Sequence, residues 1–169
     1  MAAVAPIPAS TTPAQAAWGK FLEEFLIKPK ACSHAIVMNK SDGTMWATTS
    51  EDKHSCKTYS DMIMMEDGTE VSKTVDEEKG LLEYIVAFKK PEAGIRIGGN
   101  KFTALRTFEK GANDDGLPTV YLKKPKGGGC IVVTERAIIF GVWEEGAQAA
   151  AACNDAVEKM GRYLKSAKF

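Results

Sequence analysis

The stretch CIVVTERAIIFGVW, residues 130–143, contains two apolar runs, 130–134 and 137–143, separated only by Glu135 and Arg136. Both runs are rich in β-branched and aromatic residues, which is typical of buried strands. So short a connection cannot cross over a sheet, and it therefore predicts two antiparallel neighbours. Shorter runs of the same kind precede this pair, at residues 95–97, 102–108 and 119–123. The C-terminal half is therefore predicted to form an antiparallel sheet.

The N-terminal part begins with a helical pattern. Thr12 and Gln15 have the spacing of a capping box, and Pro13 suits the first helical position. Apolar residues then recur every three or four positions until Pro29, which cannot continue a helix; they are Trp18, Phe21, Leu22, Phe25 and Leu26. This stripe predicts one amphipathic helix.

Two further helices are predicted. A second capping box, Thr74 with Glu77, precedes a helical repeat that runs from Leu81 to Phe88, and Pro91 and Gly94 close the segment. The longest helix is predicted over residues 146–168, where Ala-rich sequence carries apolar residues at helical spacing.

The segments between these elements contain residues typical of turns and loops, together with two short predicted strands. Strands at 35–39 and 44–49 are joined by Asp42-Gly43, which predicts a hairpin. Residues 50–70 are polar and acidic without a sustained period, so a loop or irregular insertion is expected there, with residues 62–65 as a fragment of strand or helix. The glycines at 127–129 precede a strand and are interpreted as a tight hairpin turn, not as a phosphate-binding loop.

The order of these elements predicts an α+β fold. An antiparallel sheet that must be covered on both faces would carry its N- and C-terminal helices on one face and its internal helix on the other. The chain is long enough for a single domain, predicted over residues 12–169 with a probable insertion at about 51–70. The Pro- and Ala-rich residues 1–11 are predicted to be a flexible tail.

Composition argues against several functional classes. The 22 basic and 22 acidic residues balance, which argues against nucleic acid as the main partner. The four cysteines form no CxxC pair and there are only two histidines, so neither a metal site nor a cofactor is predicted. GxSxG, HExxH, GxxxxGK and GxGxxG motifs are absent, and we predict no catalytic residue. The N-terminus lacks the features of a secretory signal, so a cytoplasmic protein is expected.

Three stretches of the sequence together resemble the profilin family. They are WGKF at 18–21 with Trp46, IGGNKF at 97–102 followed by Arg106, and ACN at 152–154 followed by VE at 157–158 and GRYL at 161–164. The resemblance covers roughly residues 15–169, apart from 51–70. It implies a monomeric, non-catalytic, cytoskeleton-associated adaptor that binds monomeric actin, regulates actin polymerisation and docks proline-rich partners such as formins.

The resemblance implies that proline-rich segments bind between the terminal helices, at Trp18, Phe21, Trp46, Tyr163, Leu164 and Phe169. Such a ligand is already extended and offers flat rings and carbonyls, so aromatic faces with N–H or O–H donors complement it. Aromatic residues packed in the core would show the same periodicity as aromatic residues in a binding groove. Only the resemblance favours the groove for Trp18 and Tyr163. Phe25 is assigned to the core with Leu26. Phe21 replaces a tyrosine found in many family members, which removes one hydroxyl donor and predicts weaker binding.

The resemblance also implies an actin-binding surface, formed by Lys101, Thr103, Ala104, Arg106, Lys123, Lys124, Asn154, Asp155 and Glu158. Alternate side chains of a flat strand point to opposite faces, so a bulge or an edge contact is needed if Thr103, Ala104 and Arg106 all contact actin. Otherwise the set of residues taken over from the family is too large. Asp155 departs from the basic or neutral residue common in the family. A solvated charged face is the alternative interpretation for Lys124 and Lys126.

A further prediction concerns anionic lipid. The family also binds phosphoinositide head groups, which the resemblance places here on Lys123, Lys124, Lys126, Arg162 and Lys165.

Two alternatives remain open from the sequence. One is a sensory or scaffold module with a similar sheet that holds a small ligand in its core. The other is a thiol enzyme that uses Cys130 or Cys153, although Cys153 on an apolar helix face is expected to be buried and inert.

Overall fold

The computed structural model describes residues 13–49 and 56–169. The predictions for the tail at 1–11, for the Thr12 capping box and for the first part of the insertion, 51–55, lie outside the described residues.

The centre of the fold is a seven-stranded sheet in which every neighbouring pair is antiparallel. Its order is β2-β1-β9-β8-β7-β6-β5. The strands are β1 (His34–Asn39), β2 (Met45–Thr48), β5 (Ile95–Ile97), β6 (Asn100–Phe108), β7 (Thr119–Lys124), β8 (Gly127–Val133) and β9 (Ala137–Glu144). The predicted pairing within 130–143 is confirmed, because β8 and β9 are neighbours with Val133 opposite Ile138.

Both faces of the sheet are buried, and strand β9 illustrates how. Ala137 and Ile139 belong to the core cluster beneath the terminal helices. Ile138, Phe140 and Val142 belong to a second cluster, on the side of the internal helix. Because side chains of a strand alternate between faces, the continuous apolar run of β9 supplies both cores.

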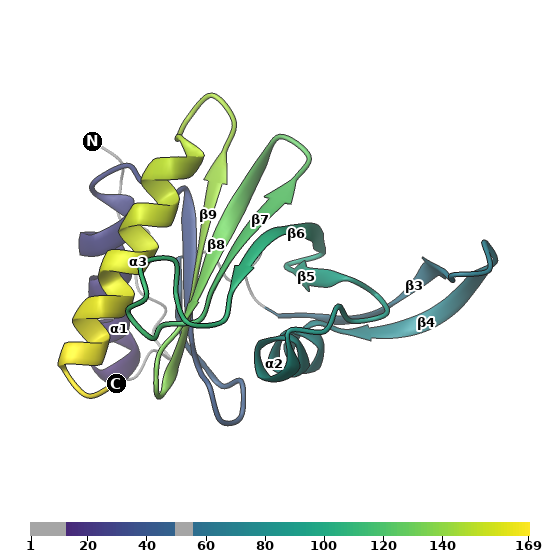
Figure 1. The fold of residues 1–169 in the computed structure, drawn as a ribbon, viewed down its shortest axis with the longest axis horizontal. Coiled ribbons are helices and arrows are strands. Elements are labelled where there is room, and N and C mark those ends of the chain that lie inside the picture. The colour runs from purple at the N-terminus through teal and green to yellow at the C-terminus, as the bar shows by residue number, and fades with distance from the viewer. Residues whose placement is uncertain (1–12, 50–55) are drawn as a thin grey trace.

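Three helical segments cover these faces (Figure 1). α1 (Pro13–Leu22) continues as a π-helical segment, η1 (Glu23–Ile27), and with α3 (Ala150–Ser166) it covers one face. α2 (Glu77–Ala87) covers the other. The predicted α+β fold is therefore confirmed. None of the helices in the described ranges has the length and apolarity to cross a bilayer.

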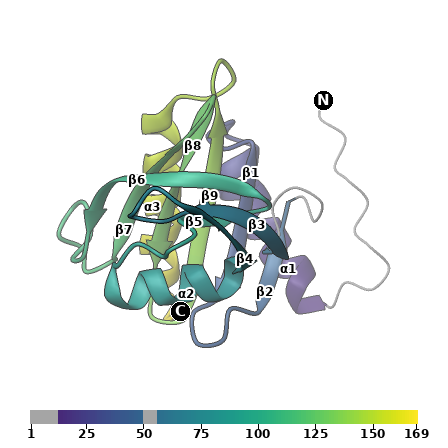
Figure 2. The same ribbon diagram turned by 90° about the vertical axis from the view of Figure 1, so that its right-hand side faces the viewer.

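The prediction of an irregular segment at 50–70 is wrong for residues 58–64, which form a strand, and the predicted fragment of strand or helix at 62–65 lies largely in that strand. Residues from 58 form an antiparallel hairpin of β3 (Thr58–Met64) and β4 (Glu70–Asp76), which we call the arm. The arm projects away from the sheet beyond α2 and β5 (Figures 1 and 2). Most of its side chains are exposed, and only Ile63 and Val75 are buried. A hairpin with so little buried surface has no strong hydrophobic period, which explains the failed prediction.

The arm is joined to the body by one buried carboxylate. Glu77 is 2% exposed, and it accepts hydrogen bonds from Lys57 N (2.9 Å) and Tyr59 Oη (3.0 Å) at the base of β3. The same carboxylate accepts bonds from Gly98 N (2.8 Å) and Gly99 N (2.7 Å) in the β5–β6 turn. Glu77 therefore connects the arm, the start of α2 and that turn.

The predicted capping box of α2 is also wrong. Asp76 is the N-cap, with its side chain accepting a hydrogen bond from Lys79 N at 3.0 Å, and Thr74 lies in β4. A capping box needs a Glu or Gln three positions after the cap, whereas Glu77 directly follows the cap and bonds elsewhere.

The glycines at 127–129 lie inside β8 and are not the predicted turn, which is made by Pro125 and Lys126. They are needed for close packing. A Cβ on Gly128 would lie 2.8 Å from Nε1 of Trp143, and one on Gly129 would lie 2.8 Å from the carbonyl oxygen of Gly141. Glycine is therefore required where neighbouring strands and rings approach the backbone.

We expect Glu77→Gln to destabilise the protein by about 3 kcal/mol, because an amide nitrogen at this buried position cannot accept the hydrogen bonds that one carboxylate oxygen now accepts from two of the four donors. Urea unfolding measures the change. Glu78→Gln is the matched control, since Glu78 is exposed, and it should change stability by less than about 0.5 kcal/mol. Equal unfolding midpoints for the two variants would contradict the role of Glu77.

Candidate binding sites

Aromatic side chains from both ends of the chain meet beside β2. The aromatic cluster, as we call it, consists of Trp18, Phe21, Phe25, Trp46, Tyr163 and Phe169. Trp18 lies at its centre, stacked on Trp46 with a centroid distance of 4.9 Å and an interplanar angle of 20°. Phe169 meets Trp18 edge-on at 5.4 Å. The chain end is held in place by a hydrogen bond from Phe169 N to Leu164 O, 2.9 Å long.

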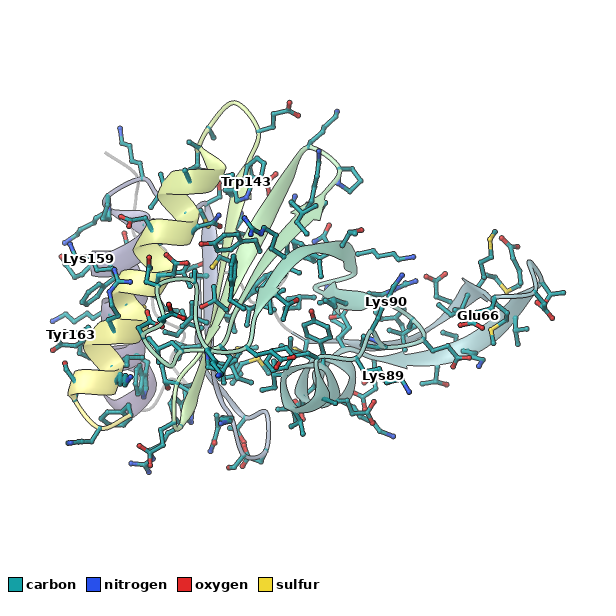
Figure 3. The ribbon with its side chains drawn as sticks, in the orientation of Figure 1. Glu66, Lys89, Lys90, Trp143, Lys159 and Tyr163 are labelled. Carbon is teal, nitrogen blue, oxygen red and sulfur yellow. The ribbon has the colours of Figure 1, made fainter. Side chains whose placement is uncertain are left out.

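The other half of the cluster connects α1 and η1 to α3. Tyr163 lies 5.8 Å from Phe21 and 5.2 Å from Phe25, measured between ring centroids. Tyr163 is 45% exposed and lies on the side of α3 turned away from the sheet (Figure 3). The other rings are partly buried. The cluster therefore presents a continuous, partly open aromatic surface.

The structure changes two assignments in this region. Phe25, expected in the core, is partly exposed and belongs to the cluster, whereas Leu26 is fully buried as expected. Leu164, expected in the groove, is 2% exposed and supports the cluster from below. The sequence of the first helix already contained a pattern that separates the cluster rings from the core residues. Trp18, Phe21 and Phe25 follow one line of its surface, and the aliphatic Leu22 and Leu26 follow the adjacent line.

The cluster also contains polar groups suited to an extended ligand. Indole N–H groups of Trp18 and Trp46 and the hydroxyl of Tyr163 are donors, which a ligand rich in carbonyls requires. The Arg136 guanidinium lies over the Phe169 ring at 5.4 Å, a cation–π contact that the sequence did not predict.

A second candidate surface lies on β6 and β7, and a bulge, one of the alternatives that the sequence left open, is present in it. Lys101, Thr103, Ala104 and Arg106 are all exposed. The pairing of β6 with β7 shifts between Ala104 and Arg106, with Leu105 as the extra residue. A bulge changes which face the following side chains point to, so the strand can expose consecutive residues. Lys123, opposite Thr103, extends the surface onto β7.

The three predicted actin-binding residues on α3 differ in exposure. Asp155 is exposed and Asn154 partly so, but Glu158 is only 6% exposed. Glu158 accepts a hydrogen bond of 2.5 Å from the Tyr121 hydroxyl. Its carboxylate is therefore an internal link between α3 and β7 and is not an open contact. Burial, followed by the hydrogen bond to Glu158, raises the pKa of Tyr121 above its ordinary value.

The predicted phosphoinositide residues form two groups. Lys123, Lys124 and Lys126 flank the β7–β8 turn, and Lys124 is ion-paired with Glu144 at 2.9 Å. Arg162 and Lys165 lie on α3, and both contact Asp115. The Arg162 guanidinium is 3.8 Å from the Asp115 carboxylate, and the Lys165 ammonium group donates a hydrogen bond to the Asp115 carbonyl oxygen.

The structure gives little support to the two alternative functions. Burial raises the pKa of Cys130 well above its ordinary value, and the contact with Cys32, together with burial, raises that of Cys153. Neither thiol is thus a ready nucleophile. An open hollow of about 440 Å³ lies between the arm, α2 and β5 and is lined by charged residues such as Lys73, Glu83 and Arg96. It is at the surface, not in the core.

Comparison with known proteins gives consistent matches. The Profilin family model matches residues 16–169. A profilin from Tetrahymena pyriformis is 25% identical over 162 residues, covering 90% of this chain and 98% of that protein. Among solved structures, Acanthamoeba castellanii profilin II has a TM-score of 0.63 at 23% identity, with 90% of this chain and 99% of that chain covered. Mouse profilin IIa, in complex with a double repeat from the FH1 domain of mDia1, has a TM-score of 0.62 at 16% identity, with the same coverage.

The bond between Tyr121 and Glu158 predicts a pH-dependent stability. Because folding raises the pKa of Tyr121, its neutral form stabilises the folded state below about pH 10, the ordinary value for tyrosine, and this contribution is lost at higher pH. We expect Tyr121→Phe to lower stability by about 2 kcal/mol at pH 7 and the difference from wild type to shrink above pH 10.

Urea unfolding from pH 7 to 11 tests this expectation. Tyr163→Phe, which removes a hydroxyl from an exposed ring, should stay within about 0.5 kcal/mol of wild type at pH 7. A difference for Tyr121→Phe that does not vary with pH would exclude this titration.

Proposed function

The chain belongs to the profilin family, and from that premise we propose that it is an actin-monomer-binding adaptor that docks proline-rich segments on its aromatic cluster. Its role is to bind two partners and thereby regulate actin polymerisation, with no bond chemistry of its own. A cytoplasmic, cytoskeleton-associated location follows from this proposal.

The aromatic cluster carries the proposal. Six rings that could have been buried instead stay partly open and in contact with each other, centred on the Trp18–Trp46 stack. A polyproline helix fits such a surface because its rings can lie against aromatic faces while its carbonyls accept hydrogen bonds. The related mouse profilin IIa was solved with an FH1 repeat, which favours the same class of ligand here.

Support for the actin site comes from the β6–β7 surface. Lys101, Arg106 and Lys123 give it a positive charge on an exposed, bulged edge. Arg106 is held over the Phe108 ring at 5.0 Å, which restricts its position. Positive charge at such a surface improves the orientation and rate of association with an acidic partner. Asn154 and Asp155 extend the proposed surface to α3, and Glu158 supports it from inside.

Phosphoinositide binding is a further part of the proposal. Lys123 and Lys126 are exposed beside the β7–β8 turn. A cluster of this size gives only modest attraction to anionic lipid.

Trp18→Ala should weaken binding of a polyproline decamer at least tenfold, because it removes the ring on which Trp46 and Phe169 both pack. Isothermal titration calorimetry measures the affinity without relying on the tryptophan signal. Trp143→Ala is the control, since Trp143 lies at the far end of the sheet, away from the aromatic cluster (Figure 3). If both folded variants bind like wild type, proline docking at the cluster is wrong.

Arg106→Glu should weaken binding of monomeric actin at least tenfold and leave polyproline binding unchanged, because it reverses a charge on the β6–β7 surface only. Lys40→Glu makes the same charge change at an exposed lysine in the β1–β2 turn, and it should behave like wild type. Actin affinity is measured by the concentration of protein needed to hold actin monomeric. Equal effects of the two variants would indicate a general charge effect and no defined site.

Phe21→Tyr should strengthen polyproline binding about fivefold, since one added hydrogen bond contributes roughly 1 kcal/mol. The ring lies between Trp18 and Tyr163 at 5.8 Å from each. The same calorimetric titration tests it, with Phe88→Tyr on the opposite face of the sheet as the control. An unchanged or weaker affinity would mean that the added hydroxyl does not reach the ligand.

A further inference from the structure

Two thiols that the proposed function does not use lie in direct contact. The Sγ atoms of Cys32 and Cys153 are 3.4 Å apart. Both residues are buried, with exposures of 2% and 0%. They come from segments 121 positions apart in the chain, so only the fold brings them together.

Each side of the contact is fixed by the backbone. Cys32 lies in the turn between η1 and β1, where its N–H donates to Leu26 O at 2.9 Å. Cys153 lies in the first turn of α3 and its side chain faces the sheet core. Gly141 of β9 leaves the space for the pair, since a Cβ there would lie 2.8 Å from Sγ of Cys32 and 3.5 Å from Sγ of Cys153.

We propose that Cys32 and Cys153 form an intramolecular disulfide when hydrogen peroxide oxidises the protein. The bond requires the two sulfurs, now 3.4 Å apart, to approach by about 1.4 Å, to a length near 2.05 Å. Cys32 is in a turn, so it can shift without breaking a helix.

The chemistry proceeds in two steps. The Cys32 thiolate attacks one peroxide oxygen, the O–O bond breaks, and the leaving hydroxide takes up a proton, which gives a sulfenic acid and one water. The Cys153 thiolate then attacks the Cys32 sulfur, the S–O bond breaks, and the leaving hydroxide takes up the proton that Cys153 lost, which gives a second water. Two thiols are oxidised by two electrons and one peroxide is reduced. Because the raised pKa of Cys153 keeps its thiolate scarce, the reaction should be slow and should depend on local opening of the turn.

Cys56, the remaining thiol with partial exposure, is a poor competitor. It lies on the other side of the sheet, near α2. Burial and the charge of Glu77 raise its pKa to about 12, so it is protonated at neutral pH. Cys130 is fully buried in the same cluster as the pair and provides a buried thiol for comparison.

The disulfide would close a covalent loop between the turn after η1 and α3. Phe25 lies in η1, directly before that turn, and Tyr163 lies in α3, so the disulfide would also fix the two helical segments that carry this pair of cluster rings. A cross-link over so long a loop restricts the unfolded chain, and the oxidised protein should melt several degrees higher than the reduced one.

The test uses the full-length wild type, treated with hydrogen peroxide and then alkylated under denaturing conditions. Non-reducing peptide mapping should find the Cys32 and Cys153 peptides linked, with an intact mass lower by two hydrogens. The melting temperature should rise and return to its original value after dithiothreitol. Recovery of both peptides alkylated and unlinked, or with sulfinic acid instead of a disulfide, would overturn the proposal.

Single cysteine variants identify which thiols form the bond. Cys153→Ser should abolish the peroxide-induced rise in melting temperature, whereas Cys56→Ser and Cys130→Ser should retain it. A rise that persists in folded Cys153→Ser, or that is lost in Cys56→Ser, would overturn the assignment of the pair. Wild-type mapping decides the question even if a core variant fails to fold.

Discussion

Burial of the central sheet on both faces is the constraint from which the rest of the fold follows. β8 and β9 have almost no polar side chains, so neither face can remain in water. α1, η1 and α3 must cover one side and α2 the other. The helices can then expose only their outer surfaces to partners, and within the central sheet β6 is a strand on which most side chains are exposed. The aromatic cluster lies on the outer side of the terminal helices, and the proposed actin surface is centred on β6.

The arm is stabilised in a different way, because it has little hydrophobic surface to bury. An isolated two-stranded hairpin is marginally stable in water, and here polar links to the body compensate. Glu77 accepts two hydrogen bonds from the base of the arm and two from the β5–β6 turn. An ion pair between Arg96 and Asp61 adds a second attachment farther along β3, and Arg96 lowers the pKa of that carboxyl. Glu77 therefore connects the base of the arm to the Gly98–Gly99 turn that precedes β6.

Sequence reasoning succeeded where burial imposes a period and failed where polar contacts determine the structure. The two apolar runs in residues 130–143 and the helical stripe from Trp18 to Leu26 predicted elements that form the two cores. The arm was missed because strands with exposed faces show no hydrophobic period. Glu77 was assigned to a helix cap because its distant partners cannot be read from local sequence. Phe25 was assigned to the core because periodicity identifies the buried side of a helix but not the rings at its border.

The geometry of α3 explains how one small domain could serve two partners at once. Asn154, on the proposed actin surface, and Tyr163, in the aromatic cluster, are nine residues apart. At 100° and 1.5 Å per residue, they lie on opposite sides of the helix and about 13 Å apart along its axis. The buried stripe of Cys153, Val157, Met160 and Leu164 fixes the rotation of α3 against the sheet. A ligand on either side therefore meets a helix that cannot turn, and the two partners can approach from different directions without competing for the same side chains.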